Sequence, residues 1–179
     1  MKSRRKGFTL AEVLVTIAII ATLAAVLLPA LNSQLSKGEA TRGSTDLLAV
    51  QTAINTFVTD VRRYPASLTQ LASPITGLID INGNTYSVGL ANRWKGPYLA
   101  KALTTGGELS TGFGANILGP FVPGLYNGIQ YVRVDVSPIT PTDFNRLDEI
   151  IDETVSSSTG QLQYNAVSSV AQFFAIPIQ

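Results

Sequence analysis

Residues 1–31, MKSRRKGFTLAEVLVTIAIIATLAAVLLPAL, decide the fold of this chain. A short head with four basic side chains ends at Gly7, and a 24-residue apolar run, residues 8–31, follows with one charge, Glu12, and one proline, Pro29. As an α-helix this run would be ~36 Å long, which is enough to cross a bilayer core of ~30 Å. Because basic residues stay on the cytoplasmic side of a membrane, the pattern predicts a single membrane-spanning helix that leaves the cytoplasm.

Two general interpretations of this stretch are a secretory signal peptide and a plain membrane anchor. The run is longer than the apolar part of a signal peptide, and no small-x-small cleavage site follows Leu28. A plain anchor does not explain Glu12, because a carboxylate inside an apolar span costs roughly 2.5–3.5 kcal/mol and normally has a partner or a function.

The segment Gly7-Phe8-Thr9-Leu10-Ala11-Glu12 resembles the class III signal of type IV prepilins and of type II secretion pseudopilins. The resemblance implies that prepilin peptidase cleaves between Gly7 and Phe8 and that the new N-terminal Phe8 is N-methylated. It also places Glu12 at the position of the family's glutamate, and Pro29 where many members have a helix-loosening proline.

The setting of Glu12 indicates a role in assembly rather than in catalysis. Cleavage after Gly7 would leave a charged amine on Phe8, and Glu12 of one subunit could pair with the Phe8 amine of a neighbour. In a packed apolar bundle an unpaired charge is far less favourable than a paired one. Glu12 and Phe8 are therefore predicted to set the register of subunits in a filament.

Composition excludes several classes of function. The 179 residues contain no cysteine and no histidine, which removes disulfides, thiol chemistry and the commonest general base. The formal net charge is +1, and residues 8–179 hold nine Lys and Arg against twelve Asp and Glu, a formal −3. No direct contact with nucleic acid is expected from such a balance, and the chain is not expected to be an enzyme.

Beyond the apolar run the helix is predicted to continue as an amphipathic segment. Apolar residues recur there at three- and four-residue spacing: Leu47, Val50, Ile54, Phe57 and Val61. Tyr64-Pro65 is expected to end the helix, because the residue before proline avoids the α region. The domains are therefore a leader at 1–7, a transmembrane and filament-core helix at 8–31, its amphipathic continuation at 32–63 and a globular α/β head at 64–179.

Within the head we expect a hairpin around Asn82-Gly83, since this dipeptide favours the type I′ turn. Residues 106–128 are rich in glycine and are predicted to be a loop. Residues 129–136 alternate apolar and polar side chains, which predicts a strand. Arg93 to Leu99 is predicted to be a packed aromatic turn, and its Gly-Pro-Tyr-Leu part also resembles a segment of major pseudopilins.

A second helix is predicted from Thr140-Pro141-Thr142-Asp143, where Thr140 would cap the helix and Pro141 would occupy its first position. Its acids are expected to form a solvated face: Asp148, Glu149, Asp152 and Glu153. No cofactor is expected. Major pseudopilins as a family bind calcium, and Asp148 and Asp152 are the candidate ligands here, but their spacing is helical and no metal site is assigned.

Together these features predict an α+β, pilin-like fold, with a long N-terminal helix packed on a small antiparallel β-sheet. The expected function is a structural subunit of a type IV pilus-like filament, first of all a type II secretion pseudopilin that drives protein export. The alternatives are a type IV pilus subunit for adhesion, twitching motility or DNA uptake, and a membrane-anchored binding domain that does not polymerise.

The resemblance also implies partners and a location. The partners would be further copies of the chain, prepilin peptidase, other pilins or pseudopilins, and the assembly platform of the bacterial inner membrane. The chain would cross that membrane once, with its head periplasmic or extracellular, before it enters the filament.

Overall fold

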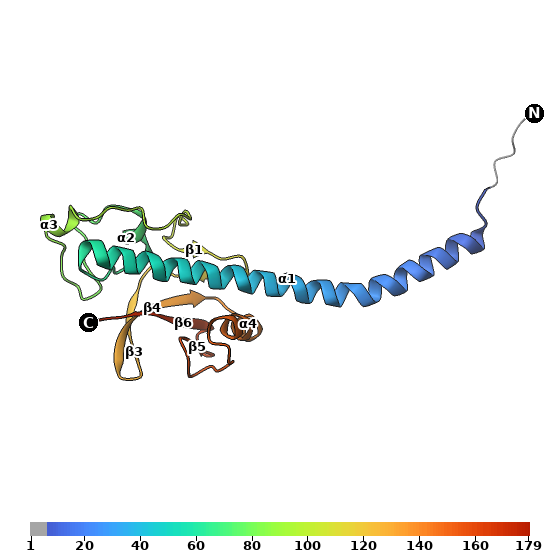
Figure 1. Ribbon diagram of the computed structural model, residues 1–179. Helices are drawn as coiled ribbons and strands as arrows, with labels where there is room; N and C mark the ends of the chain where they lie inside the picture. Colours follow the sequence, from blue (N-terminus) through green and yellow to red (C-terminus); the bar gives the residue numbers. More distant parts are fainter. Residues whose placement is uncertain (1–6) are drawn as a thin grey trace, which may run out of the picture. The chain divides into compact units, whose positions relative to one another are not determined.

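The computed structural model describes residues 7–179, and its longest element is the helix α1, Leu10–Val61 (Figure 1). Contacts within the chain divide it into two units between Gly38 and Glu39. The described part of the first unit is helical from Leu10 onward. The second unit contains the rest of α1 and all other helices and strands.

The second unit is an α+β head built on one antiparallel sheet. Its helices are α2 (Leu68–Ala72), α3 (Val88–Ala91) and α4 (Pro141–Ile151). Its strands are β1 (Leu109–Ser110), β2 (Asn116–Ile117), β3 (Val122–Tyr126), β4 (Ile129–Ser137), β5 (Leu162–Asn165) and β6 (Val170–Pro177). The strand order is β1-β2-β4-β6-β5, and β3 also pairs with β4. The predicted fold class, a long apolar N-terminal helix with a small antiparallel sheet, is confirmed.

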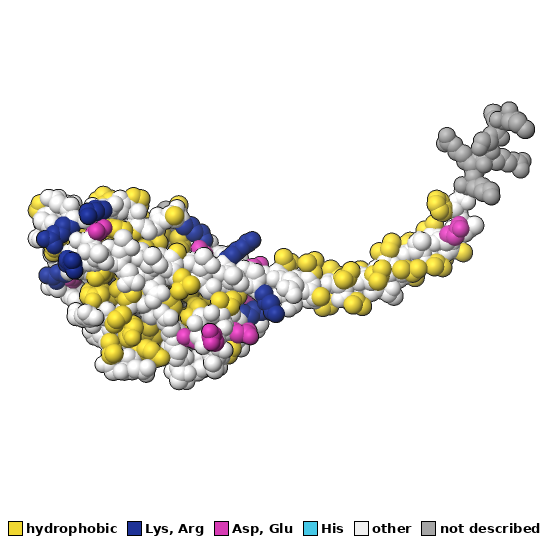
Figure 2. Space-filling model, in the orientation of Figure 1, with side chains coloured by type: hydrophobic (Ala, Val, Ile, Leu, Met, Phe, Trp, Pro, Cys, Tyr) yellow, Lys and Arg dark blue, Asp and Glu magenta, His cyan; other side chains and the backbone are white. Residues whose placement is uncertain are grey.

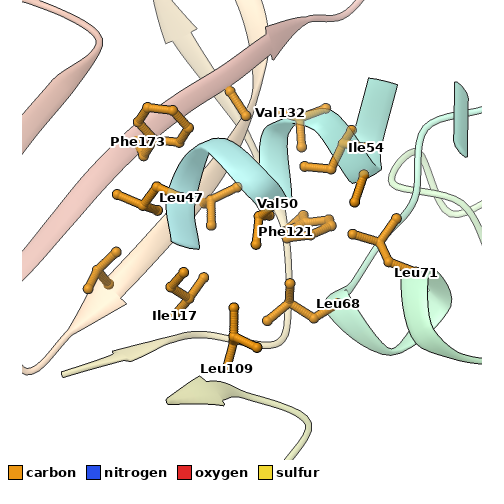
Figure 3. Close-up of a cluster of buried hydrophobic side chains, with 14 of the residues drawn as sticks. Leu47, Val50, Ile54, Leu68, Leu71, Leu109, Ile117, Phe121, Val132 and Phe173 are labelled. Atoms are coloured by element: carbon orange, nitrogen blue, oxygen red, sulfur yellow. The ribbon is translucent and has the colours of Figure 1, made fainter. Parts of the chain in front are cut away.

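The amphipathic part of α1 supplies the centre of the core. All five predicted apolar positions are 0–1% exposed: Leu47, Val50, Ile54, Phe57 and Val61. Figure 3 shows Leu47, Val50 and Ile54 facing side chains from the sheet and from α2. One face of α1 contacts the side chains of the sheet and those of α2. The three- and four-residue spacing of its apolar residues therefore determines which face of α1 the sheet and α2 cover.

Strand β4 is the predicted strand, and its apolar face is buried. Val132, Val134 and Val136 are each 0% exposed, whereas the residues between them are half-buried. β4 pairs with β6 over most of its length, so the C-terminal strand lies inside the sheet, with β5 beyond it. This position explains why β6 is apolar at nearly every residue.

The predicted hairpin at Asn82-Gly83 is present only as a short antiparallel contact, and its turn is not of the predicted type. Ile79 and Thr85 form an isolated antiparallel bridge, and the Asp80 N–H donates to the carbonyl of Asn84 at 2.8 Å. Only Gly83 has a positive φ, 81°, whereas a type I′ turn requires positive φ at both central residues. The buried carboxylate of Asp80 determines the local structure: it accepts hydrogen bonds from the N–H groups of Asn82 and Asn84, and it pairs with Arg63 at 2.9 Å. The expected second strand instead leads into α3, which begins after Ser87.

The expected loop at 106–128 is interrupted by strands β1, β2 and β3, so this prediction is wrong for those residues and holds for the segments between them. β3 and β4 form a hairpin whose turn is Asn127-Gly128, with φ angles of 51° and 77°. This is the backbone geometry of the type I′ turn that the Asn-Gly rule describes. The same dipeptide signal therefore marks a type I′ turn at Asn127, whereas the turn at Asn82 has another geometry and Asp80 binds its backbone.

α1 ends earlier than the proline rule predicts. Its last residue is Val61, and Arg62 has a φ of 63°, in the left-handed region that stops a helix. Pro65 then pairs with Asp80 in an isolated bridge. The chain reversal after the helix is thus produced by Arg62, and Pro65 lies beyond it.

Gly43 allows close packing against α1. A Cβ atom placed on Gly43 would lie 2.1 Å from Cε1 of Phe113, whereas one on Gly38 would meet nothing within 4 Å. The phenyl ring of Phe113 therefore occupies the space that a side chain at position 43 would take. Glycine has a lower helix propensity than alanine, but at position 43 it allows the ring of Phe113 to pack against the helix.

We expect Gly43→Ala to lower the free energy of unfolding of the head by about 1–3 kcal/mol, because the ring of Phe113 must move. Gly38→Ala is the matched control, and it should leave stability unchanged or slightly higher because alanine favours the helix. Thermal unfolding followed by the fluorescence of Trp94, the single tryptophan, would measure both. Equal melting temperatures for the two variants would contradict this account.

Candidate functional site

The start of α1 is held by a reciprocal pair of hydrogen bonds between Thr9 and Glu12. The Thr9 hydroxyl oxygen accepts a bond from the Glu12 N–H at 3.2 Å, and Glu12 Oε2 accepts one from the Thr9 N–H at 2.8 Å. The Thr9 hydroxyl also donates to Oε2, at 2.9 Å. This arrangement is a capping box, with Glu12 at the third helical position. The spacing Thr-x-x-Glu in the sequence is the signature of a capping box. Glu12 thus has a structural role at the helix start in addition to the assembly role predicted from the sequence.

Both of the side-chain bonds that Glu12 accepts end on Oε2. The lone pairs of Oε1 can therefore accept a further bond while the helix stays capped. Glu12 is thus able to combine a local role at the helix start with a contact to another chain.

The first unit exposes a continuous apolar surface (Figure 2). Phe8 is 89% exposed and Leu10 79%. The other large apolar side chains on this surface are Val13, Leu14, Val15, Ile17, Ile19, Ile20, Leu23, Val26, Leu27, Leu28, Leu31 and Leu35. By length and composition α1 can cross a membrane, and none of its most apolar stretch is buried in the protein. Such a surface requires lipid or other apolar helices around it.

The polar groups of this apolar stretch are satisfied within the helix. The hydroxyl of Thr16 donates to the carbonyl of Val13, and that of Thr22 donates to the carbonyl of Ile19, each at 2.8 Å. α1 also continues through Pro29, although proline has no N–H to donate. Since these two hydroxyls are paired within the helix, they can lie in an environment without water.

Gly7 and Phe8 precede the helix, with Gly7 exposed and followed directly by the capping box. The proposed cleavage, methylation and register roles of Gly7, Phe8 and Glu12 remain predictions, as does the helix-loosening role of Pro29. The basic residues of the leader, at 2–6, lie outside the described residues.

Helix α4 begins as predicted. The Thr140 hydroxyl oxygen accepts a bond from the Asp143 N–H at 3.2 Å and donates to Asp143 Oδ2 at 2.7 Å, and Pro141 is the first helical residue. Phe144 and Leu147 form its buried face.

The predicted solvated acidic face on α4 is wrong for two of its four members. Asp148 is 0% exposed, and Asp152 is half-buried. Asp148 accepts a bond from the Ser156 N–H at 2.8 Å, and Asp152 accepts bonds from the N–H groups of Gln161 and Leu162. These carboxylates bind the loop that follows α4, and only Glu149 and Glu153 are exposed to solvent.

Within residues 7–179, no three Asp, Glu, His or Cys side chains lie close enough together to hold a metal ion. Asp148 and Asp152 supply only two carboxylates, fewer than the six to eight oxygens that calcium takes. Calcium binding through this pair stays a prediction.

The predicted aromatic turn is present. The ring of Tyr98 makes edge contacts with Phe57 and Trp94, at centroid distances of 5.7 Å in both cases. The indole N–H of Trp94 donates to the carbonyl of Gln70 at 2.9 Å. A Cβ atom on Gly96 would lie 2.4 Å from the indole ring, so this glycine is required by packing.

Comparison with known proteins finds one family model at the N-terminus and several relatives that match part of the chain. Residues 2–28 match the family model described as "Prokaryotic N-terminal methylation motif". The chain is 35% identical over 66 residues to the type II secretion system core protein G of Aeromonas hydrophila, which is 37% of this chain and 46% of that protein. No solved structure matches the chain.

Type IV pilins are also among the relatives. The chain is 49% identical over 51 residues to the type IV major alpha-pilin of Moraxella bovis, covering 28% of this chain and 32% of the pilin. It is 38% identical over 60 residues to a type IV major fimbrial protein of Dichelobacter nodosus, covering 34% and 38% of the two chains. The chain thus spans about half or less of the length of these relatives, and none of the three names describes an enzyme.

The match to the methylation motif coincides with the capped start of α1 and the exposed apolar helix. In this respect the chain is pilin-like, with similarity to type II secretion pseudopilins and to type IV pilins.

Proposed function

We propose that this chain is a structural subunit of a type IV pilus-like helical filament, and we assign it first to the pseudopilins of type II secretion. The observation that carries the proposal is the exposed apolar surface of residues 8–35, which overlaps the methylation motif at residues 2–28. In a membrane this surface contacts lipid. In a filament it would contact the same helices of neighbouring copies, so a subunit can move between the two environments at little cost in free energy.

Glu12 makes the position of a subunit specific in this proposal. Apolar helices slide past one another because their contacts are similar in every register. Cleavage after Gly7 would create a positive amine at Phe8, and Oε1 of Glu12 is available to accept a hydrogen bond from the amine of a neighbour. A correctly placed subunit satisfies both charges, whereas a displaced one leaves both unpaired in an apolar bundle.

The proposal includes the processing and assembly partners. Prepilin peptidase would cleave the leader, and the assembly platform of the bacterial inner membrane would add subunits together with other pilins or pseudopilins. The head would then be periplasmic or extracellular. In a pseudopilus, the growing filament would push secreted proteins outward.

The second candidate function is a type IV pilus subunit, which the similarity to the Moraxella bovis pilin favours. A deletion that stops protein export but not twitching supports the pseudopilin, and the opposite result supports the pilus. A membrane-anchored binding domain that never polymerises is the third alternative, and it requires neither cleavage at Gly7 nor a charge at Glu12.

We expect the intact mass of the protein from its native membrane to correspond to a chain that begins at Phe8 and carries one additional methyl group. N-terminal sequencing would confirm the first residue. A chain that still begins at Met1 would contradict prepilin processing and leave an anchored domain.

We expect Glu12→Gln to reduce filament yield strongly, by tenfold or more, while membrane insertion and cleavage at Gly7 remain normal. Glutamine can still serve in a capping box, so this variant removes the charge but keeps the helix start. Filaments would be counted by electron microscopy in cells that express equal amounts of each variant.

Thr9→Val is the matched control, because it removes the capping hydroxyl and keeps the carboxylate of Glu12. It should assemble better than Glu12→Gln. Normal filaments from Glu12→Gln would refute the charge-pairing role, even if the protein is a filament subunit.

A further inference from the structure

A surface pocket of about 420 Å³ is lined by aromatic residues from three strands: Tyr126 of β3, Tyr131 of β4 and Phe174 of β6. The ring centroids of Tyr126 and Phe174 are 5.2 Å apart, and that of Tyr131 lies 5.9 Å from the first and 6.2 Å from the second. Phe174 is only 4% exposed, whereas both tyrosines are half-buried. The two tyrosine rings therefore supply the aromatic surface that a ligand can touch.

Two glutamines in the wall of this pocket leave acceptors unpaired. The side-chain N–H group of Gln51 donates to the carbonyl of Ala175, and that of Gln161 donates to the carbonyl of Phe174 at 3.1 Å. Within residues 7–179, neither side-chain amide oxygen accepts a hydrogen bond. Both oxygens can thus accept a bond from a ligand that carries several donors.

Asp152 adds a carboxylate to the same wall. Its two oxygens accept the backbone N–H groups of Gln161 and Leu162, at 2.9 and 2.8 Å, which fixes the orientation of the group. Each oxygen keeps a lone pair for a further donor. No Lys or Arg side chain in the described part of the chain forms an ion pair with Asp152. A carboxylate without a cation, beside aromatic rings, is suited to binding an organic cation.

We propose that this pocket binds the guanidinium group of an arginine side chain that a second copy of this chain supplies. A guanidinium group is planar and stacks on aromatic rings, and its five N–H donors match a carboxylate together with neutral amide oxygens. The ammonium group of lysine is a compact, strongly hydrated charge without a flat face. The combination of rings and acceptors in the pocket therefore favours arginine over lysine.

The head itself carries arginines that lack a partner. Five of the eight Lys and Arg side chains in residues 39–179 form ion pairs, and the three that form none are all arginines: Arg42, Arg62 and Arg93. The stem of Arg42 packs on Gly112, since a Cβ atom on that glycine would lie 3.4 Å from Cδ of Arg42. Arg62 and Arg93 are exposed, and they are the donors that we assign.

Arg62 and Arg93 lie away from the pocket of their own chain. Arg62 follows α1 and Arg93 follows α3, and Figures 1 and 2 show Lys and Arg side chains gathered at the end of the head where these helices end. Gln51, in the pocket, precedes Val61 by ten helical residues, a rise of ~15 Å. A contact between two different surfaces of identical chains can repeat from copy to copy, as in a helical filament. The inference thus rests on the proposed function.

The site is tested by a nuclear magnetic resonance titration of the full-length chain in detergent micelles with EDTA, which follows the ring signals of Tyr126 and Tyr131. N-acetyl-arginine amide is the probe, and N-acetyl-citrulline amide, which has a similar shape and no charge, is its control. The citrulline compound should bind about tenfold more weakly, because it lacks the charge that Asp152 and the rings attract. Equal affinity for the two compounds would overturn the proposal.

Two variants alter the pocket in different ways. Asp152→Asn removes the charge and should bind the arginine probe about as weakly as the citrulline compound binds to the unaltered protein. Tyr131→Leu removes one ring, and it should weaken binding about fivefold. Glu149→Gln, an exposed acid of α4 outside the pocket, is the matched control and should bind normally. If Asp152→Asn does not fold, Tyr131→Leu decides, and unchanged binding by either folded variant would refute the site.

The source of the arginine is tested in filaments. The double variant Arg62→Gln, Arg93→Gln should lower filament yield about tenfold while its own pocket still binds the arginine probe. Lys95→Gln, a nearby cation that pairs with Asp60, is the control and should assemble normally. Normal filaments from the double variant would refute the second copy as the source. If the unaltered protein forms no filaments, the proposed function and the second-copy source both fail, whereas the titration in micelles still decides the pocket.

Discussion

The burial of one face of α1 is the constraint on which the rest of the structure depends. From Leu47 to Val61 this face is covered by the sheet and by α2, and its apolar side chains are 0–1% exposed at five positions. From Leu10 to Leu35 the large apolar side chains of the same helix are exposed in the part of the chain that the structure describes. Since apolar area in water costs about 25 cal/mol per Å², the second stretch requires a different environment, which the chain alone does not supply.

The charged and polar groups of the N-terminal stretch are organised so that this environment can be apolar. Thr16 and Thr22 satisfy their hydroxyls on the helix itself, and Thr9 and Glu12 satisfy each other at its start. Glu12 retains a free oxygen, and it is the only carboxylate in the stretch. A pilin-like subunit needs these properties, because it must be stable in lipid and yet recognise a defined position among identical helices.

In the head, buried carboxylates replace regular secondary structure where the chain must turn. Asp80 binds Arg63 and two backbone N–H groups between α2 and α3, and Asp148 and Asp152 bind three N–H groups after α4. A carboxylate can accept several hydrogen bonds at once, so one side chain can order a segment that contains little regular structure. These loops then depend on the hydrogen bonds of a few carboxylates.

The sequence by itself determined the features that depend on residues close together in the chain. These include the apolar run from Phe8, the buried stripe from Leu47 to Val61, the alternation in β4 and the cap at Thr140, because helix and strand periodicity are local properties. It did not determine which of the two dipeptides, Asn82-Gly83 or Asn127-Gly128, forms a type I′ turn. Both carry the same turn signal, and only the tertiary structure, which places Asp80 against one and β4 against the other, distinguishes them.

The acids of α4 show the same limit. Their helical spacing is compatible with a solvated face, and the side chains of Glu149 and Glu153 follow that expectation. Asp148 and Asp152 instead accept hydrogen bonds from backbone N–H groups that lie eight to ten residues further along the chain. The sequence thus decided which residues form each helix and strand. The burial of Asp148 was decided only by how those elements and their loops pack together.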